Sequence, residues 1–139
     1  PMAKQQKGWV YAPSKTKSNL AVPAAFKDEI KRRGDELIES TLKPAHLEPP
    51  PADPQFNYIE QIDCYWRGRF FYFFATYRVA GPNAIVPTFE SKFARMEYQG
   101  NSTFNLAFQR YNDQWFEIGH AVSADDCFDS IGSDPLFHP

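Results

Sequence analysis

The sequence predicts an α+β fold: a long N-terminal helix packed on an antiparallel sheet of about five strands, followed by a short C-terminal helix. Apolar residues recur at helical spacing from about residue 23 to 42, and they alternate with polar residues from Tyr58 onward. The chain has 139 residues, the length of one ordinary domain. With 42% hydrophobic and 17% aromatic residues, it can form a core without disulfides or metals.

Residues 1–22 are predicted to form an extended basic arm in front of a single domain that spans residues 23–139. The arm shows neither a period of 2 nor one of 3.6, and its two large rings are Trp9 and Tyr11. Five lysines precede the first acidic residue, Asp28, in a chain whose net charge is −2: Lys4, Lys7, Lys15, Lys17 and Lys27. The arm is either a solvated tail or a segment that binds an anionic partner. Its rings dock on their own sheet or on a neighbour's.

The long helix is predicted over residues 23–42. Pro23 suits the first helical position, and Phe26, Ile30 and Leu37 fall near one face. Pro44 is expected to stop the helix. The segment LKPAHLEPPPADPQF then forms a stiff proline-rich strap, because proline fixes φ and lacks an amide proton.

The sheet begins at Tyr58, where Ile62, Cys64 and Trp66 alternate with polar residues. A hairpin turn at Arg67-Gly68 leads to RFFYFFATYRV, which is apolar on both faces and is expected to be a central strand covered on both sides. Further strands are predicted at about 89–99 and 103–111, and a last one at WFEIGHAV. The inward side chains of the fourth strand are expected to be Phe104, Leu106 and Phe108.

The closing helix is predicted to begin after Ser123, which offers an N-cap with Asp126 three residues later, and to end at Gly132. His120, Asp125, Asp126 and Cys127 lie close together here. These residue types occur in zinc sites and thiol nucleophiles, but their spacing matches no motif, and first-turn acids with a packed cysteine explain them better. Cys64 and Cys127 are expected to be reduced.

The candidate binding residues combine aromatic rings with cations. Such a surface suits stacked single-stranded nucleic acid or the anchors of a protein interface. Alternatively, the rings belong to the core and the arginines pair with Glu60, Glu90 and Glu97 across strands. The candidates are Trp9, Tyr11, Tyr65, Trp66, Arg67, Arg69 and Tyr72, with Tyr77, Arg78, Lys92, Arg95, Arg110 and Tyr111 on neighbouring strands.

Long blocks of the chain resemble a family of small bacterial hypothetical proteins of unknown function. The resemblance lies in VPAAFKDEIKRRGDELIESTLKPAHLEPPPADPQFNYI, in FESKFARMEYQGNSTFNLAFQRYNDQWFEI and in the ending SDPLFHP. It covers most of the chain after residue 20. It implies no activity, cofactor or catalytic residue.

These patterns favour a non-enzymatic cytoplasmic interaction module that binds a protein partner or a second copy of itself. No phosphate loop, GxSxG or HExxH motif is present, and no cofactor, metal or catalytic residue is predicted. The chain contains no run of about 18 apolar residues, so no membrane span is predicted. Two alternatives remain open: a single-stranded nucleic-acid binder, against which the pI of 5.9 counts, and a small-molecule pocket between helix and sheet.

Overall fold

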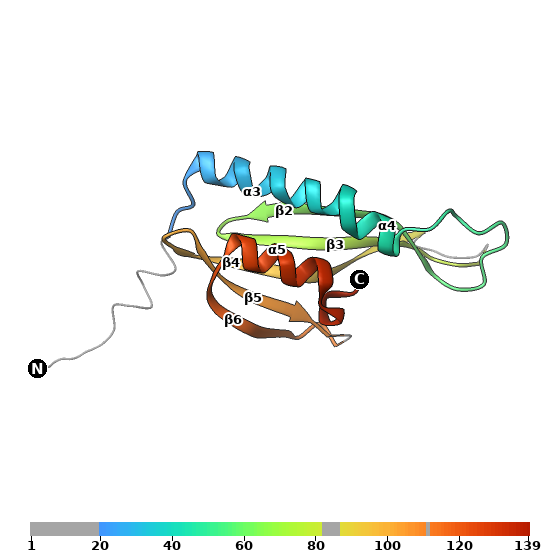
Figure 1. Cartoon of the computed structure of the whole chain (residues 1–139). Helices are drawn as coiled ribbons and strands as arrows, with labels where there is room; N and C mark the ends of the chain where they lie inside the picture. The colour runs from blue at the N-terminus through green and yellow to red at the C-terminus, as the bar shows by residue number, and fades with distance from the viewer. Residues whose placement is uncertain (1–19, 82–86, 111) are drawn as a thin grey trace, which may run out of the picture.

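In the computed structural model, the described residues are 20–81, 87–110 and 112–139 (Figure 1). Trp9, Tyr11 and Tyr111 lie outside them, as does nearly all of the predicted arm. The helical elements are α3 (Ala24–Leu37), η1 (Ile38–Leu42), α4 (Lys43–His46), α5 (Ala124–Ser133) and η2 (Pro135–Phe137). The strands are β2 (Tyr58–Arg67), β3 (Phe70–Arg78), β4 (Thr88–Gly100), β5 (Thr103–Gln109) and β6 (Trp115–Ser123). This order confirms the predicted α+β fold.

The first helix runs through Pro44, so the prediction that this proline stops it is wrong. The segment Ile38–Leu42 is a wide π turn, in which the N–H of Lys43 donates to the carbonyl of Ile38, five residues earlier. A proline inside a regular α-helix lacks one donor and clashes with the carbonyl four residues before it. Because the π turn interrupts the regular ladder just before Pro44, one more turn follows, and the helix ends at His46.

The five strands form an antiparallel sheet in the order β2-β3-β4-β5-β6. Gly68 has a φ of +60° in the predicted hairpin turn between β2 and β3, a conformation that favours glycine. The last pairing, between β5 and β6, is irregular. Its register shifts twice, and Ala121 has a φ of +53°. The side-chain oxygen of Asn105 accepts a hydrogen bond from the N–H of Ala121 at 3.2 Å and so replaces part of the interrupted ladder.

Helices α3 and α5 lie on the same side of this sheet (Figure 1). Phe71, Phe73 and Ala75 of β3 point toward them and are fully buried. The three predicted inward residues of β5 are buried as well. Burying one large apolar side chain contributes about 1.5–3 kcal/mol, so this single layer accounts for much of the stability. The space between α3 and the sheet is filled by Ile30, Ile38 and Leu42, which are at most 2% exposed.

The expectation that β3 is covered on both faces is wrong for the described residues. Its second set of side chains, Phe70, Tyr72 and Phe74, remains partly exposed on the face opposite the helices. A central strand can be apolar on both faces without a second covering layer when its outer rings pack against one another. We refer to this side of the sheet as the open face.

Helix α5 closes the helical layer. The side chain of Ser123 accepts a hydrogen bond from the N–H of Asp126 at 3.1 Å, which confirms the predicted cap. The helix passes the predicted end at Gly132 by one residue. Arg33 of α3 forms an ion pair with Asp125, and its guanidinium lies 4.9 Å from the centre of the Phe128 ring. These contacts hold α5 against α3.

Candidate functional site

One row of side chains crosses the whole open face. Its five members are direct cross-strand partners, one from each strand, in the order Tyr65, Tyr72, Arg95, Ala107 and Glu117. Ala107 is fully buried although it lies on the face without helices. Its larger neighbours therefore close over it, and the guanidinium of Arg95 comes within 3.7 Å of the Glu117 carboxylate on the far side.

Five aromatic rings, the ring cluster, form a continuous group on this face. The cluster consists of Tyr65, Phe70, Tyr72, Phe74 and Trp115, and each member is partly exposed. The ring of Tyr72 lies 5.6 Å from Tyr65, 6.1 Å from Phe70 and 5.9 Å from Trp115. The last of these contacts joins β3 to β6 across two intervening strands. Centroid distances of 4.5–7 Å are those of favourable aromatic pairs.

The cations on the open face lie against the rings and face carboxylates. The guanidinium of Arg95 lies 4.9 Å from the Trp115 ring centre and 5.4 Å from that of Phe70. Arg69 forms an ion pair with Glu97 at 2.8 Å. The ammonium of Lys92 lies 5.5 Å from the centre of the Tyr72 ring. The open face is thus rich in cation–π contacts, and its arginines are largely neutralised.

The structure separates the residues predicted from sequence to form one surface. Tyr65 and Tyr72 meet on the open face, and Arg69 lies beside Phe70 of the same face. Trp66 does not belong there. Its ring packs on Phe71 under α3, and its indole N–H donates to the carbonyl of Lys27 at 3.1 Å. Arg67 lies exposed at the hairpin end.

Three members of the ring cluster were missed as site residues: Phe70, Phe74 and Trp115. The alternation in RFFYFF places Phe70, Tyr72 and Phe74 in one phase, so this signal was present in the sequence. Trp115 could not be placed in the same way. Its contact with Tyr72 depends on the register of three successive strand pairs.

Asp35, Asp63 and Cys64 bring three potential metal ligands within 4.8 Å of one another. The ammonium of Lys31 lies 2.6 Å from Asp35 and 3.9 Å from Asp63 and so forms an ion pair with each of these carboxylates. Burial raises the pKa of the Cys64 thiol, which donates a hydrogen bond to Asp35 at 3.4 Å. A protonated thiol and an ion-paired carboxylate are poor ligands. The arrangement favours a structural network between α3 and β2.

The residues around the start of α5 that could bind zinc or form a thiol nucleophile do not come together in the structure. Cys127 is fully buried, and burial, with a smaller effect of Asp126, raises the pKa of its thiol to about 12. Asp125 pairs with Arg33, while His120 is exposed with its Nδ1 3.6 Å from Glu117. A thiolate nucleophile needs a lowered pKa and access to substrate, so this geometry favours a packing role for Cys127. Both cysteines are free.

The pH dependence of stability is expected to show a contribution from His46. Its ring lies 4.8 Å from that of His138, and burial, followed by repulsion from His138, lowers the pKa of His46 below its ordinary 6.5. The unfolded chain then binds the proton more readily, so stability present above about pH 6.5 is lost as the pH falls below it. Urea unfolding at about pH 7.5 and about pH 5.5 should show a smaller loss for His46→Gln than for the wild type.

His120→Gln is the matched control, because His120 is an exposed histidine on a different element, β6. An equal pH dependence in His46→Gln and the wild type would refute the contribution of His46.

The site so defined belongs to an α+β domain with a one-sided helical layer and an aromatic, charge-paired open face. The family described as a domain of unknown function, DUF3024, matches residues 22–139, and the chain belongs to this family. No curated protein matches the chain, and neither does any solved structure. None of the described helices is both long enough and apolar enough to cross a membrane.

Proposed function

We propose that this protein is a non-enzymatic interaction module that binds a protein partner, or a second copy of itself, through the open face. One observation carries the proposal: α3 and α5 both pack on one side of the sheet, and the ring cluster lies on the other. Contiguous apolar surface of this kind on a soluble domain is typical of interaction sites. Tryptophan, tyrosine and arginine, which meet here in Trp115, Tyr72 and Arg95, are the residue types enriched in interface hot spots.

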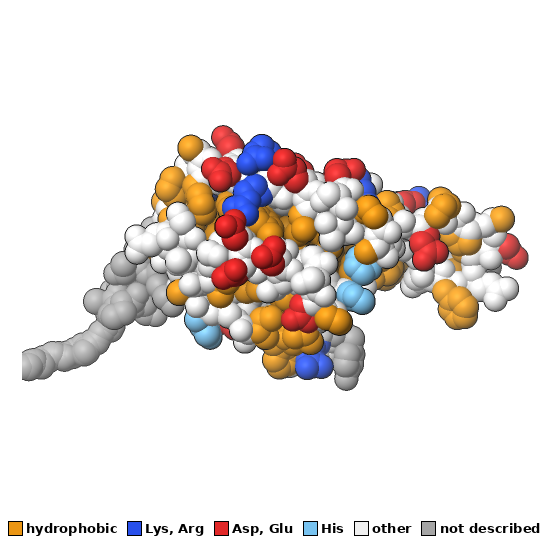
Figure 2. Space-filling view, viewed as in Figure 1, with side chains coloured by type: hydrophobic (Ala, Val, Ile, Leu, Met, Phe, Trp, Pro, Cys, Tyr) orange, Lys and Arg blue, Asp and Glu red, His pale blue; other side chains and the backbone are white. Residues whose placement is uncertain are grey.

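The two sides of the domain differ in the way this proposal requires. On the helical side, acidic side chains gather over α3 and α5 (Figure 2). Asp125, Asp126 and Asp129 of α5 are exposed there, as is typical of a solvated surface. The open face instead presents rings whose edges are only partly covered. Removing these edges from water would stabilise a complex by about 25 cal/mol per Å² of apolar area.

Charge pairing favours protein over nucleic acid as the occupant of the open face. Arg69 pairs with Glu97, Arg78 with Glu60, and Arg95 with Glu117. A phosphate backbone would have to compete with these carboxylates and would be repelled by them. A protein surface of low net charge meets no such opposition.

Arg95 adds a polar feature to the same surface. Its Nε is buried and has no hydrogen-bond acceptor among the described residues. A buried donor without a partner costs about 1–3 kcal/mol. The domain carries this cost whether or not the open face is occupied, because the atom is covered by its own neighbours.

The arm that precedes Leu20 is proposed as a second contact. Trp9 and Tyr11 are large rings in a polar segment, and such rings favour burial against another surface. We also propose a cytoplasmic location, supported by the two free, buried cysteines, since cytoplasmic thiols stay reduced.

Site-specific photocrosslinking in living cells tests the proposal. A benzophenone amino acid replaces Tyr72 at the centre of the ring cluster. In a matched chain it replaces Glu36, which is exposed on α3. Irradiation is expected to give a discrete protein adduct at position 72 that is missing at position 36, because only the open face is occupied. Mass spectrometry of the adduct then identifies a second copy or a different protein.

The absence of an adduct at position 72, or the same adducts at both positions, would refute the open face as the binding surface. The same experiment in a chain that begins at residue 20 isolates the arm. An unchanged adduct yield would remove the arm from the proposal.

A further inference from the structure

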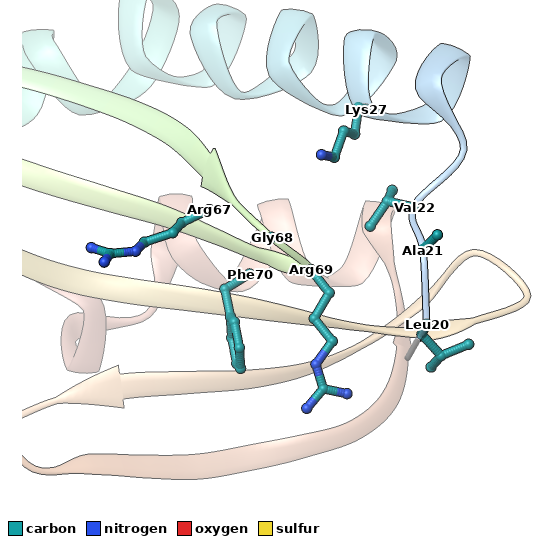
Figure 3. Close-up of a pocket in the computed structure, with 8 residues that line it drawn as sticks. All are labelled: Leu20, Ala21, Val22, Lys27, Arg67, Gly68, Arg69 and Phe70. Carbon is teal, nitrogen blue, oxygen red and sulfur yellow. The ribbon is translucent and has the colours of Figure 1, made fainter. Parts of the chain in front are cut away.

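A cavity of about 470 Å³ lies at the end of the β2–β3 hairpin, beside the open face (Figure 3). Two chain segments form it: the residues that lead into and begin α3, and the hairpin turn. Its volume is within the range of about 300–1,000 Å³ that small-molecule sites occupy. The lining residues are Leu20, Ala21, Val22, Lys27, Arg67, Gly68, Arg69 and Phe70.

The charged residues that line this hairpin cavity are all cations. Lys27 approaches from α3, and Arg67 and Arg69 extend from the two sides of the turn (Figure 3). Neither Lys27 nor Arg67 has a carboxylate partner among the described residues, whereas Arg69 pairs with Glu97. The charged ends of the lining cations point in different directions in Figure 3, so Lys27 and Arg67, which are flexible and have no carboxylate partner in the described part of the chain, would turn toward a bound anion that supplies their counter-charge.

Another cavity provides a contrast within the same sheet. Its volume is about 490 Å³, and it is lined by Phe89, Glu90, Ser91, Lys92, Gln109 and Asp113. There, two carboxylates accompany a single cation, so the site carries no excess of positive charge. The positive lining is therefore a property of the hairpin cavity and not of cavities on this sheet in general.

The remaining lining residues indicate the kind of anion. Leu20, Val22 and Phe70 are apolar and partly exposed, and they favour a ligand with an apolar body attached to its charged group. Cations from two chain segments suit an anion that accepts hydrogen bonds in several directions. A phosphate monoester has three such oxygens, whereas a carboxylate is satisfied by one arginine fork.

We infer that the hairpin cavity is a binding site for a small phosphorylated molecule, in which Lys27 and Arg67 contact the phosphate and Leu20, Val22 and Phe70 contact the organic body. This site is additional to the proposed protein interface. It lies at the hairpin end of the domain and shares Phe70 with the ring cluster, whereas the interface is centred on Tyr72.

Phenyl phosphate is the probe, because it joins a phosphate monoester to one apolar ring. Titration into the ¹⁵N-labelled full chain at millimolar concentration, in phosphate-free buffer, is expected to shift the amide signals of Gly68 and Arg69. Binding should be weaker for inorganic phosphate, which lacks the apolar body, and for phenol, which lacks the charge. Added salt should weaken binding of phenyl phosphate because the attraction is electrostatic.

The variant Lys27→Gln with Arg67→Gln is expected to bind phenyl phosphate more weakly by roughly tenfold for each cation removed. The matched control is Arg32→Gln with Lys43→Gln. It removes the same charge from exposed or partly exposed positions of the helix whose ion-pair partners are Glu36 and Glu39. The control should bind like the wild type.

Four results would overturn the inference: no binding of phenyl phosphate, equal binding of phenol, equal losses in the two double variants, or binding of a single-stranded oligothymidylate without binding of phenyl phosphate. The last result would assign the cations to nucleic acid. Crosslinking at position 72 in the Lys27→Gln, Arg67→Gln chain separates the two proposals, because it reports on the protein interface alone.

Discussion

Replacing Gly34 by valine is expected to lower the free energy of unfolding by roughly 2–3 kcal/mol, the upper range for overpacking a core. Gly34 is the point of closest approach between α3 and the sheet. A Cβ atom there would lie 2.9 Å from both the Sγ of Cys64 and the Cζ of Phe71. Phe71 is fully buried, so its ring has no free space to enter. Valine adds two further carbon atoms to this contact.

Urea unfolding of Gly34→Val and of Glu36→Val on the same helix separates crowding from helix propensity. Glu36 is exposed, so its replacement is expected to cost the β-branched penalty of up to about 0.7 kcal/mol together with a surface ion pair to Arg32 worth at most about 0.5 kcal/mol. Combining Gly34→Ala with Phe71→Leu provides a second check. Because the leucine removes the end of the ring, the double variant should lose less stability than the sum of the single ones. Additive losses would show that the two residues do not meet.

Truncating Phe73 to alanine is expected to cost about 4 kcal/mol, in the usual range for a buried phenylalanine. Phe73 is 0% exposed, and its ring contacts those of Phe71 and Phe128 at 5.4 and 6.2 Å. It therefore connects the sheet to α5. The measurement is again the free energy of unfolding in urea, with an unchanged slope as the sign of an intact fold.

The next residue in the chain is the matched control for this experiment. Phe74 has the same side chain on the same strand but lies on the open face, partly exposed beside Tyr65. Phe74→Ala is expected to cost only about 1 kcal/mol, the scale of one aromatic cross-strand pair. Equal losses at the two positions would mean that both faces of β3 are covered, and the open face would not exist.

The alternation of side chains was sufficient to predict most of the sheet. It gave the strand beginning at Tyr58, the turn at Gly68 and the three inward residues of β5, because strand geometry repeats every two residues whatever lies around it. The cap at Ser123 was equally local, since it needs only one hydroxyl and one N–H three residues later. Features determined by neighbouring residues were therefore predictable.

Features that depend on distant parts of the chain were not. Pro44 was assigned as a helix stop because the local rule is strong, and the π turn that overrides it has no sequence signature. The apolar run of β3 fits both a strand covered on two sides and a strand whose outer rings cover one another. Only the position of the helices distinguishes these arrangements.

The candidate site was predicted in part. Tyr65 and Tyr72 lie in the ring cluster, whereas Trp66 shares the phase of Ile62 and Cys64 and follows them into the core. Two of the three carboxylates predicted to pair with arginines, Glu60 and Glu97, do so, whereas Arg95 pairs with Glu117, which was not among them. Cross-strand pairs depend on register, which bulges shift by one residue at a time.

The irregular pairing of β6 affects how readily a further strand can add to this sheet. Among the described strands, β6 is one edge of the sheet, and its two register shifts and the left-handed residue Ala121 make that edge a poor template for a further strand. Edge-to-edge growth has no natural end, whereas two open faces that met around a twofold axis would cover each other. Under the proposed self-association such a pair is closed, because no third open face is left to extend it.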